Sequence, residues 1–538
     1  MYSTPVLSNG GTTRGLPISC FLNYVDDSRE GITDHYVENA FLSSFGGGIG
    51  GHWSDVRAQG TRTSKGSEST GVIPFVKVVD AEMLAFSQGV TRRGSYAAYL
   101  HMSHPEIEEF LDVRKPTGGD TNRKSINLHH GVVVPDSFME LIHSATKYPD
   151  FDDSWDLIDP HTRQVKRTVS ARALWVKLLQ NRMETGEPYI HYIDTSNREM
   201  PQFQKDLGLR INQSNLCSEI ILPTNEQRTA VCCLSSVNLE NYGAWVRDPQ
   251  FLKDVAEMLD NVLTFFIDNA PDQVSRAKFS ASRERSIGVG ALGFHAYLQK
   301  NGIAWETPEA KGANLRLFRH IRSKLDEANK ELGKERGEAP DAKGRGLRFS
   351  HVMAVAPNAS SSIIMGNTSP SIEPFRANAY RQDTLSGAFL NKNKYLDEII
   401  KKYCEEHPRT NYDEVWSSII SNDGSVQHLT QLTDEQKKIY KTSMEIDQRW
   451  LIEHAADRQE FIDQAQSLNL FFRPNVNIAY LHAVHFLAWK SGVKTLYYCR
   501  SEKLGKADKV SRKIERNIIQ EIDMTALAEG NDCLACEG

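Results

Sequence analysis

Near the middle of the chain, one thiol lies between an amide and a carboxylate. Asn215, Cys217 and Glu219 occupy alternate positions in the segment 213–221. In an extended segment, or at the tip of a loop fed by a strand, side chains two residues apart share a face. A redox or nucleophilic thiol, a carboxylate that exchanges protons and an amide that holds a hydroxyl group could then form a reaction centre. The alternative is a buried structural cysteine beside polar residues that face solvent.

Eight cysteines in a chain with cytosolic character indicate redox or catalytic use of a few thiols rather than a disulfide framework. They are Cys20, Cys217, Cys232, Cys233, Cys404, Cys499, Cys533 and Cys536. The C-x-x-C at the end of the chain is either a mobile dithiol or half of a zinc site, and the absence of a second such pair in the sequence favours the dithiol. An internal cysteine pair that gives up two electrons must be reduced again, and a dithiol on a tail could do this by thiol–disulfide exchange.

Composition and charge place the chain among soluble globular proteins. It has 538 residues, 40% hydrophobic and 25% charged residues, and a net charge of −6. No basic excess indicates nucleic-acid binding, no apolar run could span a bilayer, and the first residues lack a signal-peptide pattern. We therefore expect a cytoplasmic protein without membrane or nucleic-acid partners, large enough for one large domain or two to three ordinary ones.

Strand-like and helical segments alternate along the chain, which predicts an α/β architecture. A glycine-rich stretch at 44–51 would allow close approach of the backbone to another group. The segment 433–466 reads as strongly helical, and 493–499 reads as a strand that carries Tyr497 and Tyr498. Adjacent strand residues face opposite sides, so packing alone predicts one buried and one exposed tyrosine ring. The serine-rich run after Pro357 suits either a phosphate-binding helix start or a plain helix cap.

Several short motifs occur together in the order found in one protein family. They are Ser19-Cys20, Asn-Leu-Cys-x-Glu-Ile at 215–220, Cys-x-Leu-Ser-x-x-Asn-Leu at 232–239, Pro-x-x-Ser-Ser-Ser at 357–362, Lys-Thr-Leu-Tyr-Tyr at 494–498 and the C-terminal cysteine pair. Each motif is weak alone, but the combination is specific. From Thr4 almost to Gly538, the chain resembles the large, catalytic subunit of class I ribonucleotide reductase.

The resemblance implies a fold and a domain division. The fold would be a ten-stranded α/β barrel, with the radical cysteine on a finger loop inside it. Residues 1–515 would form the catalytic barrel without an ATP cone, and residues 516–538 a flexible tail with the redox cysteine pair. Burial inside the barrel would keep water away from the radical.

The same resemblance implies radical-dependent reduction of ribonucleoside diphosphates to 2′-deoxyribonucleoside diphosphates, with thioredoxin disulfide as the oxidised product. Cys217 would become a thiyl radical that takes the ribose 3′ hydrogen. Glu219 would deprotonate the 3′ hydroxyl group, which Asn215 would orient. Cys20 and Cys232 would supply protons and electrons for loss of the 2′ hydroxyl as water and would end as a disulfide.

Partners follow from the remaining motifs. Cys533 and Cys536 would reduce that disulfide and be reduced in turn by thioredoxin or glutaredoxin. Tyr497 and Tyr498 would carry the radical from a separate, metal-containing small subunit to Cys217. No cofactor would be bound in this chain itself, and the chain would form a homodimer.

Nucleotide-binding residues are also implied by the resemblance. The substrate-binding set is Thr4, Ser19, Gly48, Pro357, Asn358, Ala359, Ser360, Ser361 and Ser362. The residues that align with a specificity site for a dNTP or ATP effector are Asp27, Ser28 and Arg57. This effector would bind at the homodimer interface.

The chain begins later than most members of the family, so we expect no overall on/off nucleotide site. A naturally minimal enzyme, a split gene or a trimmed chain would each explain this start, and a phage-encoded enzyme would suit the first two. Three other functions remain as alternatives: an adenosylcobalamin-dependent reductase, a silent regulatory homologue and a generic thiol oxidoreductase that uses only the tail. The adjacent tyrosines argue against the first, and the intact inner cysteines argue against the other two.

Overall fold

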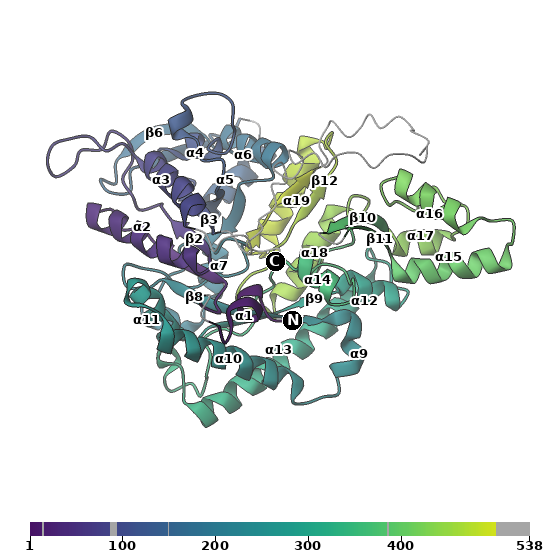
Figure 1. Cartoon of the computed structure of the whole chain (residues 1–538). Helices are drawn as coiled ribbons and strands as arrows, with labels where there is room; N and C mark the ends of the chain where they lie inside the picture. Colours follow the sequence, from purple (N-terminus) through teal and green to yellow (C-terminus); the bar gives the residue numbers. More distant parts are fainter. Residues whose placement is uncertain (13–14, 87–93, 149, 385–386, 502–538) are drawn as a thin grey trace.

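The computed structural model describes residues 1–12, 15–86, 94–148, 150–384 and 387–501 (Figure 1). Cys533, Cys536 and the expected boundary between residues 515 and 516 lie outside the described residues. Within the described part, the strands are β1 (Cys20–Tyr24), β2 (Gly48–His52), β3 (Ser95–His101), β4 (His129–Val134), β5 (Ser154–Ile158), β6 (Val165–Ser170), β7 (Tyr189–Tyr192), β8 (Ala230–Asn238), β9 (Ile287–Leu292), β10 (Ala379–Thr384), β11 (Gly387–Lys392), β12 (Leu470–Phe472), β13 (Thr495–Leu496) and β14 (Cys499–Ser501).

The central sheet has two halves of opposite direction. Its order is β13-β7-β4-β3-β2-β1-β8-β9. Strands β1, β2, β3, β4 and β7 pair in parallel, and helices cross between most of them, as parallel pairing requires. At its two edges this half meets β8 and β13, both antiparallel to it. Every residue of β4, β7, β8 and β9 is buried, as in a sheet covered on both faces.

Two further extended segments close the sheet into a ring. His351 and Val352 accept backbone hydrogen bonds from β9, and Val355 bridges in parallel to Gln466. Leu468 then accepts from the backbone of Tyr497, which directly follows β13. With segments 351–355 and 464–468 added to the eight ladder strands, ten extended segments surround the centre. The α/β barrel is therefore confirmed, although two of the ten segments in its wall are too irregular to form regular strands.

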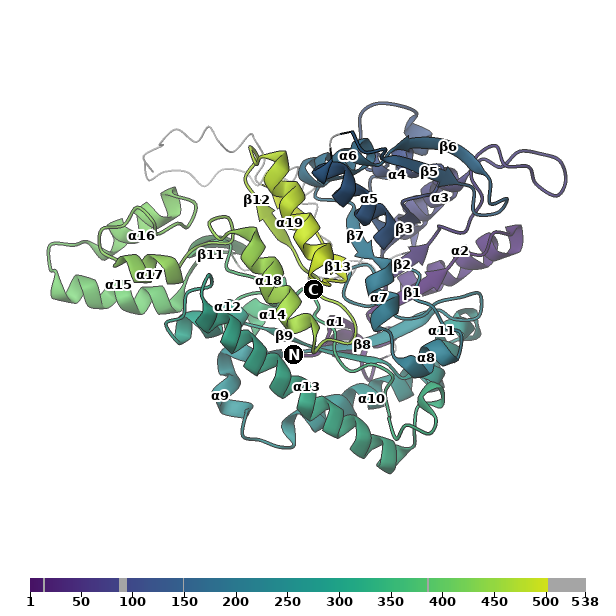
Figure 2. The same cartoon turned by 180° about the vertical axis from the view of Figure 1, so that it is seen from behind.

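Helices cover the outside of the barrel (Figures 1 and 2). The α-helices are α1 (Thr4–Asn9), α2 (Arg29–Ser44), α3 (Val72–Ala85), α4 (Ile107–Leu111), α5 (Asp136–Lys147), α6 (Ala171–Thr185), α7 (Ile193–Glu199), α8 (Gln202–Asp206), α9 (Tyr242–Trp245), α10 (Phe251–Asn269), α11 (Ser275–Glu284), α12 (Phe294–Lys300), α13 (Pro308–Arg336), α14 (Ala359–Ile364), α15 (Lys394–Glu406), α16 (Tyr412–Ser421), α17 (Asp434–Ile439), α18 (Gln448–Gln459) and α19 (Ile478–Lys490). The 3-10 turns are η1 (Thr121–Arg123), η2 (Leu239–Asn241), η3 (Asp272–Val274) and η4 (Pro340–Ala342).

Local sequence explains where the longer helices begin and end. Thr307 caps α13 by accepting from the backbone of Ala310, and Pro308 occupies the first turn, where its missing N–H costs nothing. Ser170 caps α6, which ends at Gly186 in the left-handed conformation. The predicted helix over 433–466 is wrong in two places: the non-helical residues 440–447 separate α17 from α18, and α18 ends at Gln459, after which the chain enters the barrel wall.

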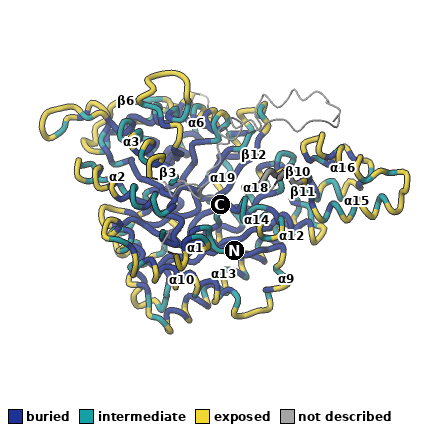
Figure 3. Tube along the Cα trace, in the orientation of Figure 1, coloured by how far each residue is buried: buried dark blue, intermediate teal, exposed yellow. Residues whose placement is uncertain are grey.

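Buried residues form one main core in the barrel and under its helices (Figure 3). A lobe built from β10, β11 and α15–α17 projects from one side (Figures 1 and 2) and has a separate apolar cluster that includes Leu396, Trp416 and Ile419. A third cluster lies inside the barrel and contains Leu216 and Cys217 together with Tyr497 and Tyr498. Among the described residues, no helix has the length and apolar character needed to cross a membrane.

Candidate active site

The segment that carries Cys217 is a tight loop inside the barrel. The Asn215 N–H donates to the Ile220 carbonyl at 3.1 Å, and the Asn215 side chain accepts from the Ile220 N–H at 3.0 Å. Ser218 has a φ of 68°, which turns the chain between these two residues. Tyr99 of β3 fixes the loop by donating to the Asn215 carbonyl at 2.8 Å. The motif is thus the tip of a loop rather than a strand.

Glycines in β2 make room for this loop. A Cβ atom at Gly50 would lie 2.0 Å from the Ser214 carbonyl oxygen, whereas Gly51 makes room for Tyr96 of β3, whose hydroxyl group would lie 1.5 Å from a Cβ atom there. At Gly48 a Cβ atom would lie 2.8 Å from the Leu216 side chain. The glycine-rich stretch therefore serves the close approach of loop to sheet, and this is the physical use that the sequence indicated.

The loop brings the amide group, the cysteine and the carboxyl group together. Asn215 Nδ2 donates to Glu219 Oε2 at 2.8 Å. Ser467 Oγ donates to the same carboxylate oxygen at 3.2 Å and also contacts the Cys217 carbonyl oxygen. Cys217 and Glu219 are both only 1% exposed, yet both line a cavity. The three residues predicted from their spacing therefore share one small volume.

Glu219 has an unusual protonation equilibrium. Burial raises the pKa of Glu219 to about 7, although the hydrogen bonds from Asn215 and Ser467 favour its ionised form. A carboxyl group with a pKa near 7 can both accept and return a proton at neutral pH, which is what general acid–base catalysis requires.

Two further thiols face each other beside this carboxylate. Cys20 of β1 and Cys232 of β8 are directly opposite in an antiparallel pair, a position in which α-carbons lie within the range that a disulfide spans. Both are reduced. Cys20 Sγ lies 4.0 Å from Glu219 Oε1. Burial raises the pKa of the Cys232 thiol well above its usual value, so this thiol keeps its proton.

The neighbouring Cys233 points the other way. It belongs to the main core that continues under the helices, whereas Cys20 and Cys232 belong to a separate inner cluster with Leu22 and Ile220. Alternation along β8 therefore separates two adjacent thiols into two environments.

The cavity at this centre is bounded by residues from distant parts of the chain. Its lining consists of Met1, Tyr2, Ser3, Thr4, Ser19, Cys20, Cys217, Glu219, Leu234, Ser235, Ser236, Ala356, Pro357, Asn358 and Ser361. The start of the chain is held there by β8, because the Ser3 N–H donates to the Leu234 carbonyl and Tyr2 bridges to Ser235.

Five of the nine predicted substrate-binding residues line this cavity, namely Thr4, Ser19, Pro357, Asn358 and Ser361. Ala359 and Ser362 instead line an adjoining cavity of about 320 Å³, which shares Pro357 and Asn358. Ser360 and Gly48 line neither of the two, and Gly48 lies against Leu216. The Asn358 side chain donates to Ser236 Oγ at 3.0 Å and so ties the serine-rich segment to β8.

Both adjacent tyrosines are buried, in contrast to the packing expectation for a regular strand. The rings of Tyr497 and Tyr498 lie 4.3 Å apart between centroids, and each residue is at most 3% exposed. The chain leaves the strand conformation between β13 and β14 at these two positions, so the alternation of faces does not apply. Tyr189 of β7 packs against both rings, with centroid distances of 4.7 and 5.1 Å.

The three predicted effector-site residues lie together near the start of α2. Arg57 Nε donates to Asp27 Oδ1 at 3.0 Å, and Ser28 Oγ accepts from the Gly31 N–H as the helix cap. His161 Nδ1 lies 3.1 Å from the same Asp27 carboxylate. This group lies outside the residues that line the inner cavity.

Several site residues escaped the sequence analysis. Ser467 contacts both Cys217 and Glu219 but directly follows a segment that was read as helix, and no motif marks it. Tyr99 and Tyr189 lie in segments that read as strands, where an aromatic residue is ordinarily core. Only the fold places them at the loop and at the tyrosine pair.

Comparison with known proteins identifies the family. A family model described as "Ribonucleotide reductase, barrel domain" matches residues 18–345 and 339–499. The chain belongs to the ribonucleotide reductase family. Among solved structures, the alpha subunit of a class Id ribonucleotide reductase from Actinobacillus ureae aligns with a TM-score of 0.81 and 36% identity, over 93% of this chain and 87% of that one.

Curated relatives of this reductase are large subunits. The ribonucleoside-diphosphate reductase large subunit of Invertebrate iridescent virus 3 is 48% identical over 100% of this chain and 90% of its own length. The corresponding subunit of Caenorhabditis elegans is 33% identical over 100% of this chain and 74% of its own length.

Proposed function

We propose that this chain is the catalytic large subunit of a class I ribonucleotide reductase and converts ribonucleoside diphosphates to 2′-deoxyribonucleoside diphosphates. One observation supports this most strongly: the loop cysteine Cys217, the carboxyl group of Glu219 and the thiol of Cys20 line one buried cavity, and Cys232 lies directly across the sheet from Cys20. A simple thiol oxidoreductase would need none of these groups inside a barrel.

The roles of the residues follow from their chemistry. Cys217, as a thiyl radical, removes the 3′ hydrogen atom of the ribose, and Glu219 takes the 3′ hydroxyl proton. Asn215 holds the carboxylate in place through its 2.8 Å hydrogen bond and helps to orient the hydroxyl group. The enclosed site excludes water that would otherwise quench the radical.

Cys20 and Cys232 supply the reducing equivalents of the reaction. The substrate loses its 2′ hydroxyl group as water, and the two thiols provide the two hydrogen equivalents and become a disulfide. The 3′ hydrogen atom returns from Cys217 to the sugar, so the thiyl radical is regenerated. Cys533 and Cys536 of the tail then reduce the disulfide and pass the oxidising equivalents to thioredoxin or glutaredoxin.

The substrate is held by Thr4, Ser19 and residues of 357–362, whose polar groups would bind its phosphates. The radical comes from a separate, metal-containing small subunit. Tyr498 and Tyr497 carry it to Cys217, in line with their membership of one inner cluster. A homodimer and a dNTP or ATP effector held by Asp27, Ser28 and Arg57 complete the proposal.

Reduction of labelled cytidine diphosphate (CDP) with dithiothreitol tests this function. The chain is assayed alone, with a class I small subunit from its source, and with adenosylcobalamin. We expect deoxycytidine diphosphate only when the small subunit is added, and none from a Cys217→Ser chain under the same conditions. Turnover with adenosylcobalamin alone would contradict class I chemistry, and turnover by Cys217→Ser would contradict the role of the loop thiol.

A further inference from the structure

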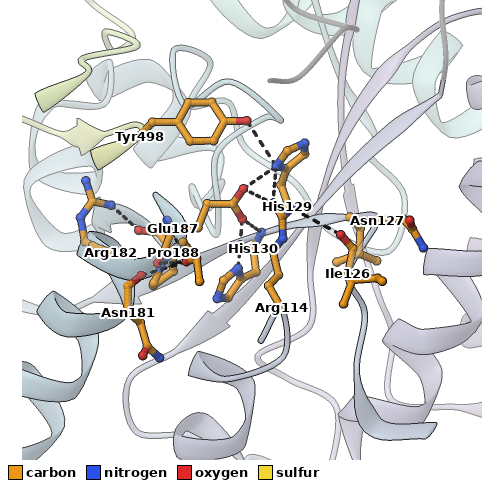
Figure 4. Close-up of polar contacts among 12 residues, drawn as sticks. Arg114, Ile126, Asn127, His129, His130, Asn181, Arg182, Glu187, Pro188 and Tyr498 are labelled. Carbon is orange, nitrogen blue, oxygen red and sulfur yellow. Dashed lines mark hydrogen bonds and ion pairs between the residues drawn. The ribbon is translucent and has the colours of Figure 1, made fainter. Parts of the chain in front are cut away.

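A buried group of charged and ionisable side chains lies beside Tyr498 and has no part in the function proposed so far (Figure 4). It consists of Glu187, at the start of the segment that leads into β7, His129 and His130 of β4, and Arg114 after α4. Glu187 is fully buried, and His129 is 7% exposed. Charged groups are rarely buried without a purpose in packing or function, because their desolvation is costly.

His129 Nδ1 is the point where this group meets the tyrosine pair. It lies 2.6 Å from Glu187 Oε1, 3.0 Å from Arg114 Nη1 and 3.3 Å from the Tyr498 hydroxyl oxygen. An ionised carboxylate only accepts hydrogen bonds, and a guanidinium group only donates them. The same nitrogen therefore has a partner both with and without a proton, which few histidine nitrogens do.

Glu187 is held as an anion beside this nitrogen. Its second oxygen accepts from the His130 N–H at 3.0 Å and lies 3.1 Å from His130 Nδ1. Burial alone would raise the pKa of Glu187, but the charge of Arg114 and these hydrogen bonds hold it well below its usual value. A negative charge is thus fixed next to His129, and it would stabilise the imidazolium ion that forms when a neutral ring gains a second proton at Nδ1.

Tyr498 needs a proton acceptor if it carries a radical. Loss of one electron makes a phenol strongly acidic, and the charged radical cation is unfavourable in a buried site. Tyr498 is 3% exposed and is packed against Tyr497 and Tyr189, so release of the proton directly to bulk water is hindered.

We propose that His129, positioned by Glu187 and Arg114, takes the phenol proton of Tyr498 when that tyrosine is oxidised and returns it when the tyrosine is reduced. This inference rests on the proposed radical role of Tyr498. In the forward step Tyr498 gives one electron to the oxidised group of the small subunit. The Tyr498 O–H bond breaks, an N–H bond forms at Nδ1, and a tyrosyl radical faces an imidazolium ion paired with Glu187. When Tyr497 gives an electron to Tyr498, the proton moves back.

A radical trap at position 498 tests the inference in the complete enzyme. Tyr498 is replaced by 3-aminotyrosine, the small subunit, CDP and effector are added, and formation of the aminotyrosyl radical is followed by stopped-flow absorbance and electron paramagnetic resonance. His129→Asn keeps a hydrogen-bond acceptor near Nδ1 but no base. We expect the rate of radical formation to fall at least tenfold, while the KM for CDP in the enzyme with the natural tyrosine stays unchanged.

His191→Asn is the matched control. His191 is a fully buried histidine on the adjacent strand β7, and its Nε2 bonds to Ser196 Oγ at 2.8 Å, apart from the Glu187 group. If the loss of any buried imidazole slows radical formation by a general structural effect, both variants will be slow and the inference is overturned. Normal radical formation in His129→Asn would overturn it as well.

Glu187→Gln gives a second variant in case His129→Asn does not fold. The neutral amide removes the charge that stabilises the imidazolium ion, so radical formation should again slow without a change in KM.

Tyr498→Phe distinguishes a failure of the proton-transfer role of His129 from a failure of the radical role of Tyr498. If Tyr498→Phe is inactive and both His129→Asn and Glu187→Gln form the radical normally, only the proton-transfer role fails. If Tyr498→Phe turns over normally, the radical route and this inference fail together.

Discussion

Glu219 combines a buried carboxyl group with donors that are all neutral. Asn215 and Ser467 hydrogen-bond to it, and none of the salt bridges among the described residues involves it. The raised pKa follows, because neutral donors offset only part of the lost hydration. Such a group suits proton transfer at neutral pH but lowers the stability of the fold once it is ionised.

Glu219→Gln should therefore stabilise the protein at alkaline pH. The folded-state pKa of about 7 lies above the usual glutamate value of 4.5, so the stability that goes with the protonated form is lost as the pH rises through 7. The difference corresponds to about 3 kcal/mol above pH 8. Denaturant titrations of both chains between pH 4 and 8 should show a gap that opens only with rising pH. A gap that is constant with pH would contradict the shifted pKa.

The same pKa sets the pH dependence of activity. In the proposed reaction Glu219 must be ionised to accept the 3′ hydroxyl proton, so kcat/KM for CDP should rise with pH through a value near 7. A pH–rate profile between pH 5.5 and 9, with the small subunit in excess, measures this. An activity that is flat from pH 5.5 to 9 would argue against Glu219 as the base.

Adjacent cysteines on β8 provide a matched pair of variants. Cys232 faces Cys20 inside the barrel and Cys233 faces the outer core, so both substitutions to alanine remove one buried thiol from one strand. Cys232→Ala should lower steady-state CDP reduction on the order of 1000-fold, whereas Cys233→Ala should keep turnover within a fewfold of the unchanged chain. Equal losses of activity in both variants would mean that CDP reduction depends on the packing of β8 and not on the inner thiol.

At the scale of elements, the close contact between β2 and the central loop sets the position of Cys217. Gly50→Ala would place a methyl group 2.0 Å from the Ser214 carbonyl oxygen, so the loop must shift. We expect CDP reduction to fall on the order of 100-fold, because small displacements of reacting groups are costly, and the free energy of unfolding to fall by about 1–3 kcal/mol.

Gly243→Ala in α9 is the control for Gly50→Ala, since nothing lies within 4 Å of a Cβ atom there. Its activity should equal that of the unchanged chain. An active Gly50→Ala chain would show that the loop position tolerates displacement.

Motifs in the sequence were sufficient to predict that three side chains of the central loop lie together, but not to predict the elements around them. The spacing of Asn215, Cys217 and Glu219 predicted a shared volume, and a tight turn rather than a strand produces it. Residues 464–466, which precede Ser467 in the barrel wall, were read as helix, because apolar periodicity does not reveal a short irregular segment that is held only by tertiary hydrogen bonds. Tyr497 and Tyr498 are both buried because they also lie in an irregular segment, between β13 and β14, where the alternation of strand faces does not apply.

At the scale of the whole molecule, the closed barrel requires a separate route for reducing equivalents. Cys20 and Cys232 are each at most 4% exposed, so thioredoxin, a folded protein, has no direct access to them. Changing both Cys533 and Cys536 to serine should abolish thioredoxin-supported multiple turnover and leave a single turnover. Product counting with thioredoxin as the only reductant measures this, and sustained turnover in this chain would refute the tail shuttle.

The oxidation state of the inner thiols after one turnover shows whether Cys20 and Cys232 are the groups that reduce the substrate. The chain with serine at both 533 and 536 is mixed with small subunit, effector and CDP but no dithiol, quenched in acid, alkylated and mapped by mass spectrometry. We predict deoxycytidine diphosphate in proportion to active chains and a Cys20–Cys232 disulfide in the same amount. Product formed while both thiols remain open to alkylation, or a disulfide that involves Cys233 instead, would contradict the proposed role of Cys20 and Cys232.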